Sequence, residues 1–282
     1  MPFMIIDFHT HIYPDHVAEK TLKAVRERAA IRSYGDGTLT GLRQSMGRAG
    51  IDLSVVCSVA TKVEQVEGIH QWLLGIRGPG IFPMATMHPD VYPRSQEIRH
   101  LRTEGFRGFK VHPDFQAFFV DEKRMYAFYE AAQAEDMLIL FHAGVDRGLP
   151  NPVHGTPERL ARVHREFPQL KIVAAHMGGE GMYGETERSL LGHDIYLDTS
   201  FVLKEMPRNM IKRFMEKHPV ERFLFGSDTP WADQRGDLEY LLSLPFLNDD
   251  AREKIAGGNA SRLLGLDGPE NPGCTQELHH RQ

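Results

Sequence analysis

Two histidines, His9 and His11, end the first apolar run of the sequence and are separated by one residue. In a β-strand, residues i and i+2 point to the same face, so the two imidazoles would converge on one side of the chain. Two converging imidazole nitrogens can occupy adjacent positions around a metal ion. An isolated His-x-His pair is also typical of an exposed edge strand, so the rest of the sequence must decide between these interpretations.

Residues that bind metals or transfer protons also end four later apolar runs. These ends are Lys110-Val111-His112-Pro113, Phe141-His142-Ala143-Gly144, Ala175-His176-Met177-Gly178-Gly179 and Gly226-Ser227-Asp228-Thr229-Pro230-Trp231. A single histidine after an apolar run is more often structural than a ligand. The agreement of five run ends favours one shared site.

The residue types at these ends suit metal-assisted chemistry. Neutral imidazoles and a carboxylate are ligands for Zn²⁺, Mn²⁺ or Fe²⁺, and a position left open for water makes such a site catalytic. The ion lowers the pKa of that water toward ~7. Asp228 could bind the ion and accept the proton of the water, while His176 could orient the water or stabilise a developing oxyanion.

The elements that would position these residues alternate along the chain. Strand-like runs, several of them rich in Val, Ile and Phe, cover residues 3–9, 53–59, 80–87, 106–112, 137–142, 171–176, 194–199 and 222–228. Amphipathic helical patterns cover residues 40–50, 63–77, 94–104, 122–135, 205–217, 237–244 and 248–264, and a further helix begins at Thr156-Pro157 and ends before Pro168. Buried parallel strands and covering helices produce this alternation.

Eight strand–helix units in series predict an α/β fold, a single (β/α)₈ TIM barrel over residues 1–266. The segment 13–37 is longer than a usual loop, and its helical stretch 19–30 predicts a helical insertion after the first strand that forms part of a lid. Residues 267–282 are polar and aperiodic and predict a surface tail. Reactive residues of such barrels lie at the C-terminal ends of the strands, where the five run ends above would meet.

Composition excludes several classes of function. The chain has 282 residues, of which 41% are hydrophobic and 25% charged, with a net charge of −5. That balance gives no basic surface for nucleic acid, and no apolar run is long enough to span a membrane. The two cysteines imply no disulfide framework, and the first strand leaves no room for a targeting segment, so we expect a cytoplasmic protein.

Taken as a set, His9-x-His11, His142, His176 and Asp228 resemble the amidohydrolase superfamily over about residues 4–265. The forms Phe-His-Ala-Gly, Ala-His-Met-Gly-Gly and Gly-Ser-Asp-Thr-Pro-Trp look most like its amidohydrolase-2 branch, which includes aminocarboxymuconate-semialdehyde decarboxylase, resorcylate decarboxylases and lactonases. The resemblance implies that His9, His11, His142 and Asp228 bind one divalent metal ion, usually zinc. It also implies that His176 is the base or the water-orienting group.

Lys110 leaves three alternatives open. In dinuclear members of the superfamily a carboxylated lysine on the fourth strand bridges two metals, and His176 would then be a ligand as well. Lys110 could instead bind a substrate carboxylate, or pair with a neighbouring acid. One ion is favoured over two.

Substrate contacts are predicted from position only. His112 shares the strand face of Lys110 and could line the pocket, although it could equally just end the strand. Arg147 lies in a loop where a cation could bind a substrate carboxylate, as do His154, Lys204 and Arg235 with weaker support. Trp231 could form a pocket wall, and exposed charge or simple packing is the alternative for each.

The sequence therefore predicts a metal-dependent hydrolase in which activated water attacks an amide, ester or lactone of a small carbonyl or carboxylate substrate. The alternative is nonoxidative decarboxylation of a small aromatic or unsaturated acid at the same site. A TatD-like nuclease is less favoured, because it would need Glu where this chain has Lys110. A non-catalytic metal-binding protein is also less favoured, and the resemblance adds the expectation of a homodimer.

Overall fold

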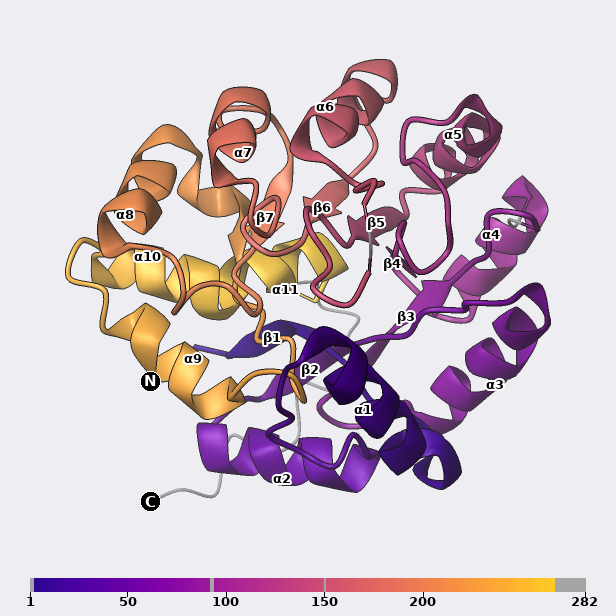
Figure 1. The fold of residues 1–282 in the computed structure, drawn as a ribbon, viewed down its shortest axis with the longest axis horizontal. Coiled ribbons are helices and arrows are strands. Elements are labelled where there is room, and N and C mark those ends of the chain that lie inside the picture. Colours follow the sequence, from indigo (N-terminus) through magenta and orange to yellow (C-terminus); the bar gives the residue numbers. More distant parts are fainter. Residues whose placement is uncertain (1–2, 92–93, 150, 267–282) are drawn as a thin grey trace.

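The computed structural model describes residues 3–91, 94–149 and 151–266. Eight parallel strands follow one another around a barrel in chain order, with helices outside them (Figure 1). Their bounds are β1 Ile6–Thr10, β2 Leu53–Cys57, β3 Ile81–Thr86, β4 Gly108–Val111, β5 Leu138–Phe141, β6 Ile172–Ala174, β7 Tyr196–Asp198 and β8 Phe223–Leu224. The chain after β8 returns to β1, where Phe8 N donates to Phe225 O at 2.8 Å. The predicted TIM barrel is confirmed.

Most helices lie where the apolar periodicity predicted them. The α-helices are α1 Asp15–Ala29, α2 Leu39–Ala49, α3 Val66–Ile76, α4 Ser95–Thr103, α5 Tyr126–Ala134, α6 Pro157–Glu166, α7 Tyr183–Ser189, α8 Arg208–Lys217, α9 Gln234–Leu242, α10 Asp249–Glu253 and α11 Asn259–Leu264. Short 3₁₀ turns span η1 Val63–Gln65, η2 Lys123–Met125 and η3 Val220–Arg222. The predicted last helix is divided by the π-helical turn η4, Lys254–Gly258. Helix α7 was not predicted, because it is short and buries only Thr186.

The insertion after β1 is confirmed as helix α1, which begins four residues before the predicted stretch. It lies in front of β2 in Figure 1, inside the ring of outer helices. Ala18 and Leu22 anchor it on one side. Val17, Lys20 and Ala24 line the same cavity as the strand ends, so α1 covers the mouth of the barrel.

A bulge in β1 decides which residues face the barrel interior. Asp7 pairs with Ser54, and Thr10 pairs with Val56. Between these two pairs β1 advances by three residues and β2 by two, so β1 contains one extra residue, which forms a bulge. Phe8 packs in the interior apolar cluster and His9 also faces inward, while Asp7 faces the helix layer and bonds Gln234 of α9 at 2.8 Å. Strict alternation would put Asp7 on the same face as His9, but the bulge interrupts the alternation between the two residues.

The remaining core forms a second apolar layer between the strands and the outer helices, with Phe109 and Phe128 among its rings. Within the part of the chain that the structure describes, no helix is long and apolar enough to span a membrane. The predicted tail, 267–282, lies outside the described residues.

Candidate metal centre

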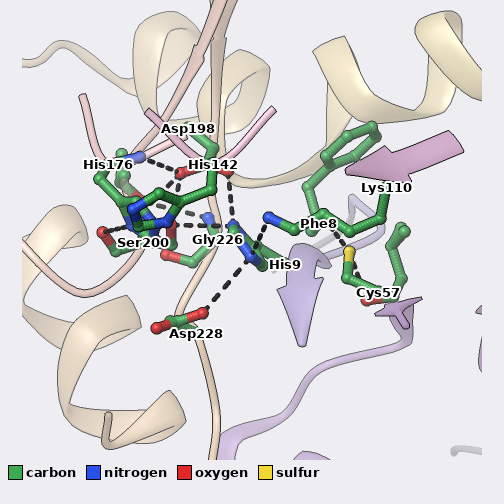
Figure 2. A network of polar contacts seen from close by, with 12 residues as sticks. Phe8, His9, Cys57, Lys110, His142, His176, Asp198, Ser200, Gly226 and Asp228 are labelled. Carbon is green, nitrogen blue, oxygen red and sulfur yellow. Dashed lines mark hydrogen bonds and ion pairs between the residues drawn. The ribbon is translucent and has the colours of Figure 1, made fainter. Parts of the chain in front are cut away.

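Three side chains from the first and last strand ends meet at one point. His9 Nε2 lies 3.2 Å from His11 Nε2, and Asp228 Oδ1 lies 3.0 Å from His11 Nε2 and 3.4 Å from His9 Nε2. Figure 2 shows His9 and Asp228 within this network. Two imidazole nitrogens and a carboxylate oxygen in contact form a donor set for a divalent cation.

The electrostatics keep these groups in the forms that bind metals. Burial lowers the pKa of His9 to about 3, so its ring is neutral at physiological pH. For Asp228, burial alone would raise the pKa, but the contacts with His11, His9 and His176 outweigh it and lower the pKa to about 2. His9 and Asp228 are therefore deprotonated, as metal binding requires.

Backbone strain coincides with two of the predicted catalytic residues. His176 and Asp228 have φ of 58° and 71°, in the left-handed region that non-glycine residues rarely adopt. Such conformations cost on the order of 1–3 kcal/mol and persist where the surroundings enforce them. At Asp228 the backbone N–H donates to His9 O at 2.8 Å, and the preceding Ser227 donates its N–H to Asp7 at 2.9 Å. Asp7 thus holds the segment that carries Asp228.

Acceptors behind each β1 histidine fix its ring. His9 Nδ1 lies 2.8 Å from Asp198 Oδ2, and His11 Nδ1 lies 2.6 Å from the carbonyl oxygen of Cys57. A carboxylate and a carbonyl accept but do not donate, so each Nδ1 carries the proton. Each Nε2 then presents a lone pair toward Asp228, as metal-binding histidines do.

His142 lies next to this cluster rather than within it. His176 stands between the two parts, with ring centroids 5.3 Å from His9 and 4.8 Å from His142. His142 lines the same cavity, and its buried Nε2 has no hydrogen-bond partner among the described residues. An orphaned buried imidazole nitrogen is a position that a cation would satisfy. His9, His11 and Asp228 therefore fit a divalent ion, and the ligand role of His142 stays a prediction.

A second group of potential ligands is better explained as a hydrogen-bonded pair. His112 Nε2 lies 3.2 Å from Asp146 Oδ2, and the His112 ring stacks on that of His142 at 4.0 Å with 10° between the planes. His112 Nδ1 accepts from the N–H of Phe115 at 3.3 Å, so Nε2 carries the proton and donates it to Asp146. A protonated nitrogen cannot bind a metal. His112 nevertheless lines the cavity, as predicted from its strand face.

Lys110 is fully enclosed beside the cluster. Its side chain is buried, and Nζ lies 2.9 Å from His9 Nε2. Burial lowers its pKa, which favours the neutral amine. Among the described residues no carboxylate lies within ion-pair distance of Nζ, so neighbouring acids do not hold it as a salt bridge. Carboxylation and substrate binding by Lys110 stay predictions.

The other predicted substrate residues differ in their surroundings. Trp231 and Arg147 both line the cavity. The Arg147 guanidinium contacts Glu180 at 2.5 Å and also Glu205, so protein carboxylates already neutralise it. The weaker candidates His154, Lys204 and Arg235 pair with Asp114, Asp237 and Glu239 respectively.

Asp198 and Ser200 both contact His9, and the sequence did not single them out. Asp198 ends the seventh strand, in the same position relative to its apolar run as the other predicted residues. This position at a strand end was the signal from which the sequence could have identified Asp198 as a candidate site residue. Its connection to His9 could not be foreseen, because the two residues are 189 positions apart.

The barrel and its cluster of strand-end histidines and aspartate define a metal-dependent enzyme class. The chain belongs to the amidohydrolase family, whose model matches residues 6–266. A comparison with curated proteins gave no match.

Solved structures share this fold at low sequence identity. A dihydroxybenzoic acid decarboxylase from Polaromonas sp. JS666, with bound manganese and the inhibitor 2-nitroresorcinol, is 17% identical with a TM-score of 0.73, over 96% of this chain and 99% of that one. The 5-carboxyvanillate decarboxylase of Sphingomonas paucimobilis is 14% identical with a TM-score of 0.66, over 93% and 99%. An uncharacterized TIM-barrel protein from Bordetella bronchiseptica is 20% identical with a TM-score of 0.72, over 93% and 98%.

Proposed function

We propose that this protein is a metal-dependent nonoxidative decarboxylase of a small aromatic acid. The observation that carries the proposal is a cavity of about 780 Å³ over the His9–His11–Asp228 cluster. Aromatic side chains from helix α3 and from several loops line it, namely Trp72 of α3 and Tyr13, Phe115, Phe201 and Trp231 of the loops. An apolar cavity with a few convergent polar groups is the usual form of a small-molecule site.

A divalent ion, Zn²⁺, Mn²⁺ or Fe²⁺, held by His9, His11, His142 and Asp228 would act as a Lewis acid toward a carboxylate or phenolic oxygen. The manganese in the dihydroxybenzoic acid decarboxylase supports a site of this kind. One ion suffices for this reaction, and the chain's own residues do the remaining work.

Decarboxylation breaks the bond between the ring carbon and the carboxyl carbon, releases CO₂ and forms a C–H bond with one added proton. Asp228 is ionised and can first accept a proton from a substrate hydroxyl at its Oδ atoms, then return it to the ring carbon. The phenolate that remains takes up one proton from water, which balances the reaction. His176 lies beside His9 and can assist this proton movement. Helix α1 and the aromatic walls exclude water, which strengthens each electrostatic contact inside.

Hydrolysis of an amide, ester or lactone is the second candidate and was the leading prediction from sequence. One observation favours it: the ionised Asp228 carboxylate lies 3.0 Å from His11 Nε2, where a general base for water is needed. Several of the similar structures are decarboxylases, which is why decarboxylation ranks first.

The test is a panel of dihydroxybenzoic and other aromatic acids, muconate-type acids, lactones and cyclic amides. Each is incubated with zinc-loaded, manganese-loaded and chelator-treated protein, and CO₂ release and ring opening are followed separately. We expect CO₂ release from an aromatic acid that chelation abolishes and metal restores. Hydrolysis without CO₂ release would favour the second candidate, and no turnover at full metal occupancy would overturn the enzymatic proposal.

Matched variants show whether the activity belongs to this site. Asp228→Asn should lower the rate by about 10²–10⁴-fold, the usual contribution of a general acid or base. His100→Ala, which removes an exposed imidazole on α4, should leave it unchanged. Equal activities of the two variants would place the chemistry elsewhere.

A further inference from the structure

Asp198 is the shared end point of two hydrogen-bond branches that reach opposite sides of the metal centre. Its carboxylate is completely buried at the end of β7. We propose that Asp198, acting with Ser200, is a positioning residue that sets the tautomers of His9 and of the His176–His142 pair, so that His9 and His142 each present an Nε2 lone pair. The inference rests on the metal centre of the proposed function, and not on which reaction occurs there.

The first branch is direct. Asp198 Oδ2 accepts the Nδ1 proton of His9 at 2.8 Å, and Ser200 Oγ lies 3.0 Å from the same nitrogen. With Nδ1 protonated, the neutral ring of His9 has its lone pair on Nε2. This atom faces Asp228 and His11.

The second branch begins at the other oxygen of the carboxylate. Ser200 Oγ donates its single proton to Asp198 Oδ1 at 2.5 Å, so it can only accept from His176 Nδ1, which lies 2.9 Å away. The carbonyl oxygen of Ser200, an obligate acceptor, lies 3.1 Å from the same nitrogen. Both contacts require the proton on His176 Nδ1.

The tautomer of His176 in turn determines the tautomer of His142. With its proton on Nδ1, His176 has its lone pair on Nε2 and must accept the Nδ1 proton of His142 across 3.0 Å. His142 therefore has its lone pair on Nε2, the buried atom without a partner among the described residues. The acceptors at the Ser200 end of this branch thus fix the position of the proton on both His176 and His142, and they leave His142 Nε2 unprotonated.

The backbone around the carboxylate holds it in place for this role. Asp198 Oδ1 also accepts the N–H of His176 at 2.9 Å and the N–H of Ser200 at 3.1 Å. Gly226 leaves the space, since a Cβ there would lie 3.5 Å from Asp198 Cβ and 2.9 Å from His9 Cβ. Figure 2 shows Asp198 and Ser200 together with His9, His176 and Gly226.

Asp198→Asn tests the proposal in the metal-free protein and by metal titration. An amide offers one acceptor in place of two, so at least one branch must lose its acceptor and the corresponding ring can change tautomer. We expect ¹⁵N NMR of the imidazoles to show loss of the Nδ1–H form at His9 or at the His176–His142 pair. We also expect the dissociation constant for Zn²⁺ or Mn²⁺ to rise by about 10–100-fold, the typical effect of losing a partner behind a metal ligand.

The matched control is Asp114→Asn. Asp114 is also a buried carboxylate bonded to a histidine Nδ1, that of His154 at 2.9 Å, but it does not line the cavity. This variant should bind metal as the wild type does. Ser200→Ala is the second variant, and should alter the His176 and His142 signals more than those of His9.

Unchanged tautomers and an unchanged metal affinity in Asp198→Asn would overturn the proposal. If that variant does not fold, unchanged His176 and His142 signals in Ser200→Ala would overturn it instead. All these measurements are made without substrate, so a failed turnover panel would contradict the proposed reaction and leave this inference standing.

Discussion

Gly226 lies directly behind His9, and replacing it with alanine should damage the metal centre without touching a ligand. An added Cβ would lie 2.9 Å from His9 Cβ and 3.3 Å from Ser200 Cβ. Gly226 is not among the described glycines with positive φ, so its backbone conformation itself tolerates alanine. We therefore expect the alanine to act through its steric contact with His9 and not through backbone strain.

The magnitude follows from contact distances. Carbon atoms normally approach to about 3.5–4.0 Å, so His9 must move by roughly 0.6–1 Å. Metal sites tolerate ligand displacements of about 0.2 Å, which places His9 Nε2 outside bonding distance. Overpacking of this kind costs about 1–3 kcal/mol, partly offset by about 0.4–1 kcal/mol from the less flexible unfolded chain.

Gly47→Ala is the matched control. Gly47 lies inside α2 with nothing within 4 Å of a built Cβ, and alanine should stabilise the helix by roughly 0.5–1 kcal/mol. Urea unfolding of the metal-free variants should thus separate them by about 2 kcal/mol, and calorimetric titration should show weakened metal binding only in Gly226→Ala. Equal stabilities together with wild-type metal affinity in Gly226→Ala would refute the packing argument.

Further expectations concern metal, pH and Lys110. Chelation should lower the melting temperature by about 5–10 °C, since ligand at 100 times its dissociation constant contributes about 2.7 kcal/mol, and Asp228→Asn should lack this difference; identical melting of the chelated and loaded wild type would contradict it. Burial lowers the pKa of His218 from 6.5 to about 4. As the pH falls from about 6.5 to about 4, this histidine is therefore protonated in the unfolded chain but not in the folded protein, and the folded state loses stability. Wild type should lose about 2 kcal/mol more than His218→Gln in unfolding free energy between pH 7 and pH 5, and parallel pH profiles would disprove this. Lys110→Met should keep one ion per chain by elemental analysis, whereas a drop from two ions to one would establish the bridging carbamate.

The barrel was predictable because its signal is repeated. Each strand is a short apolar run, and each is followed by a helical pattern or a loop, so an error at one unit does not change the fold. Candidate reactive residues at strand ends such as His9, His142 and Asp228 follow the same rule, which predicts them at one end of the barrel from the sequence alone.

What the sequence did not reveal depends on pairing between distant segments. The bulge in β1 exists only in its register with β2, so the side on which Asp7 lies could not be read from alternation. Asp198 meets His9 through the closure of the barrel. Arg147 had the right position for a substrate cation, but Glu180 and Glu205 come from other loops and already pair with it.

Anomalous diffraction from crystals grown with zinc or manganese tests the central claim most directly. The account predicts one ion per chain, bound by His9, His11, His142 and Asp228, with Nε2 of His142 turned onto it. Two ions flanking Lys110, or a metal-loaded crystal with no ion at this cluster, would contradict it.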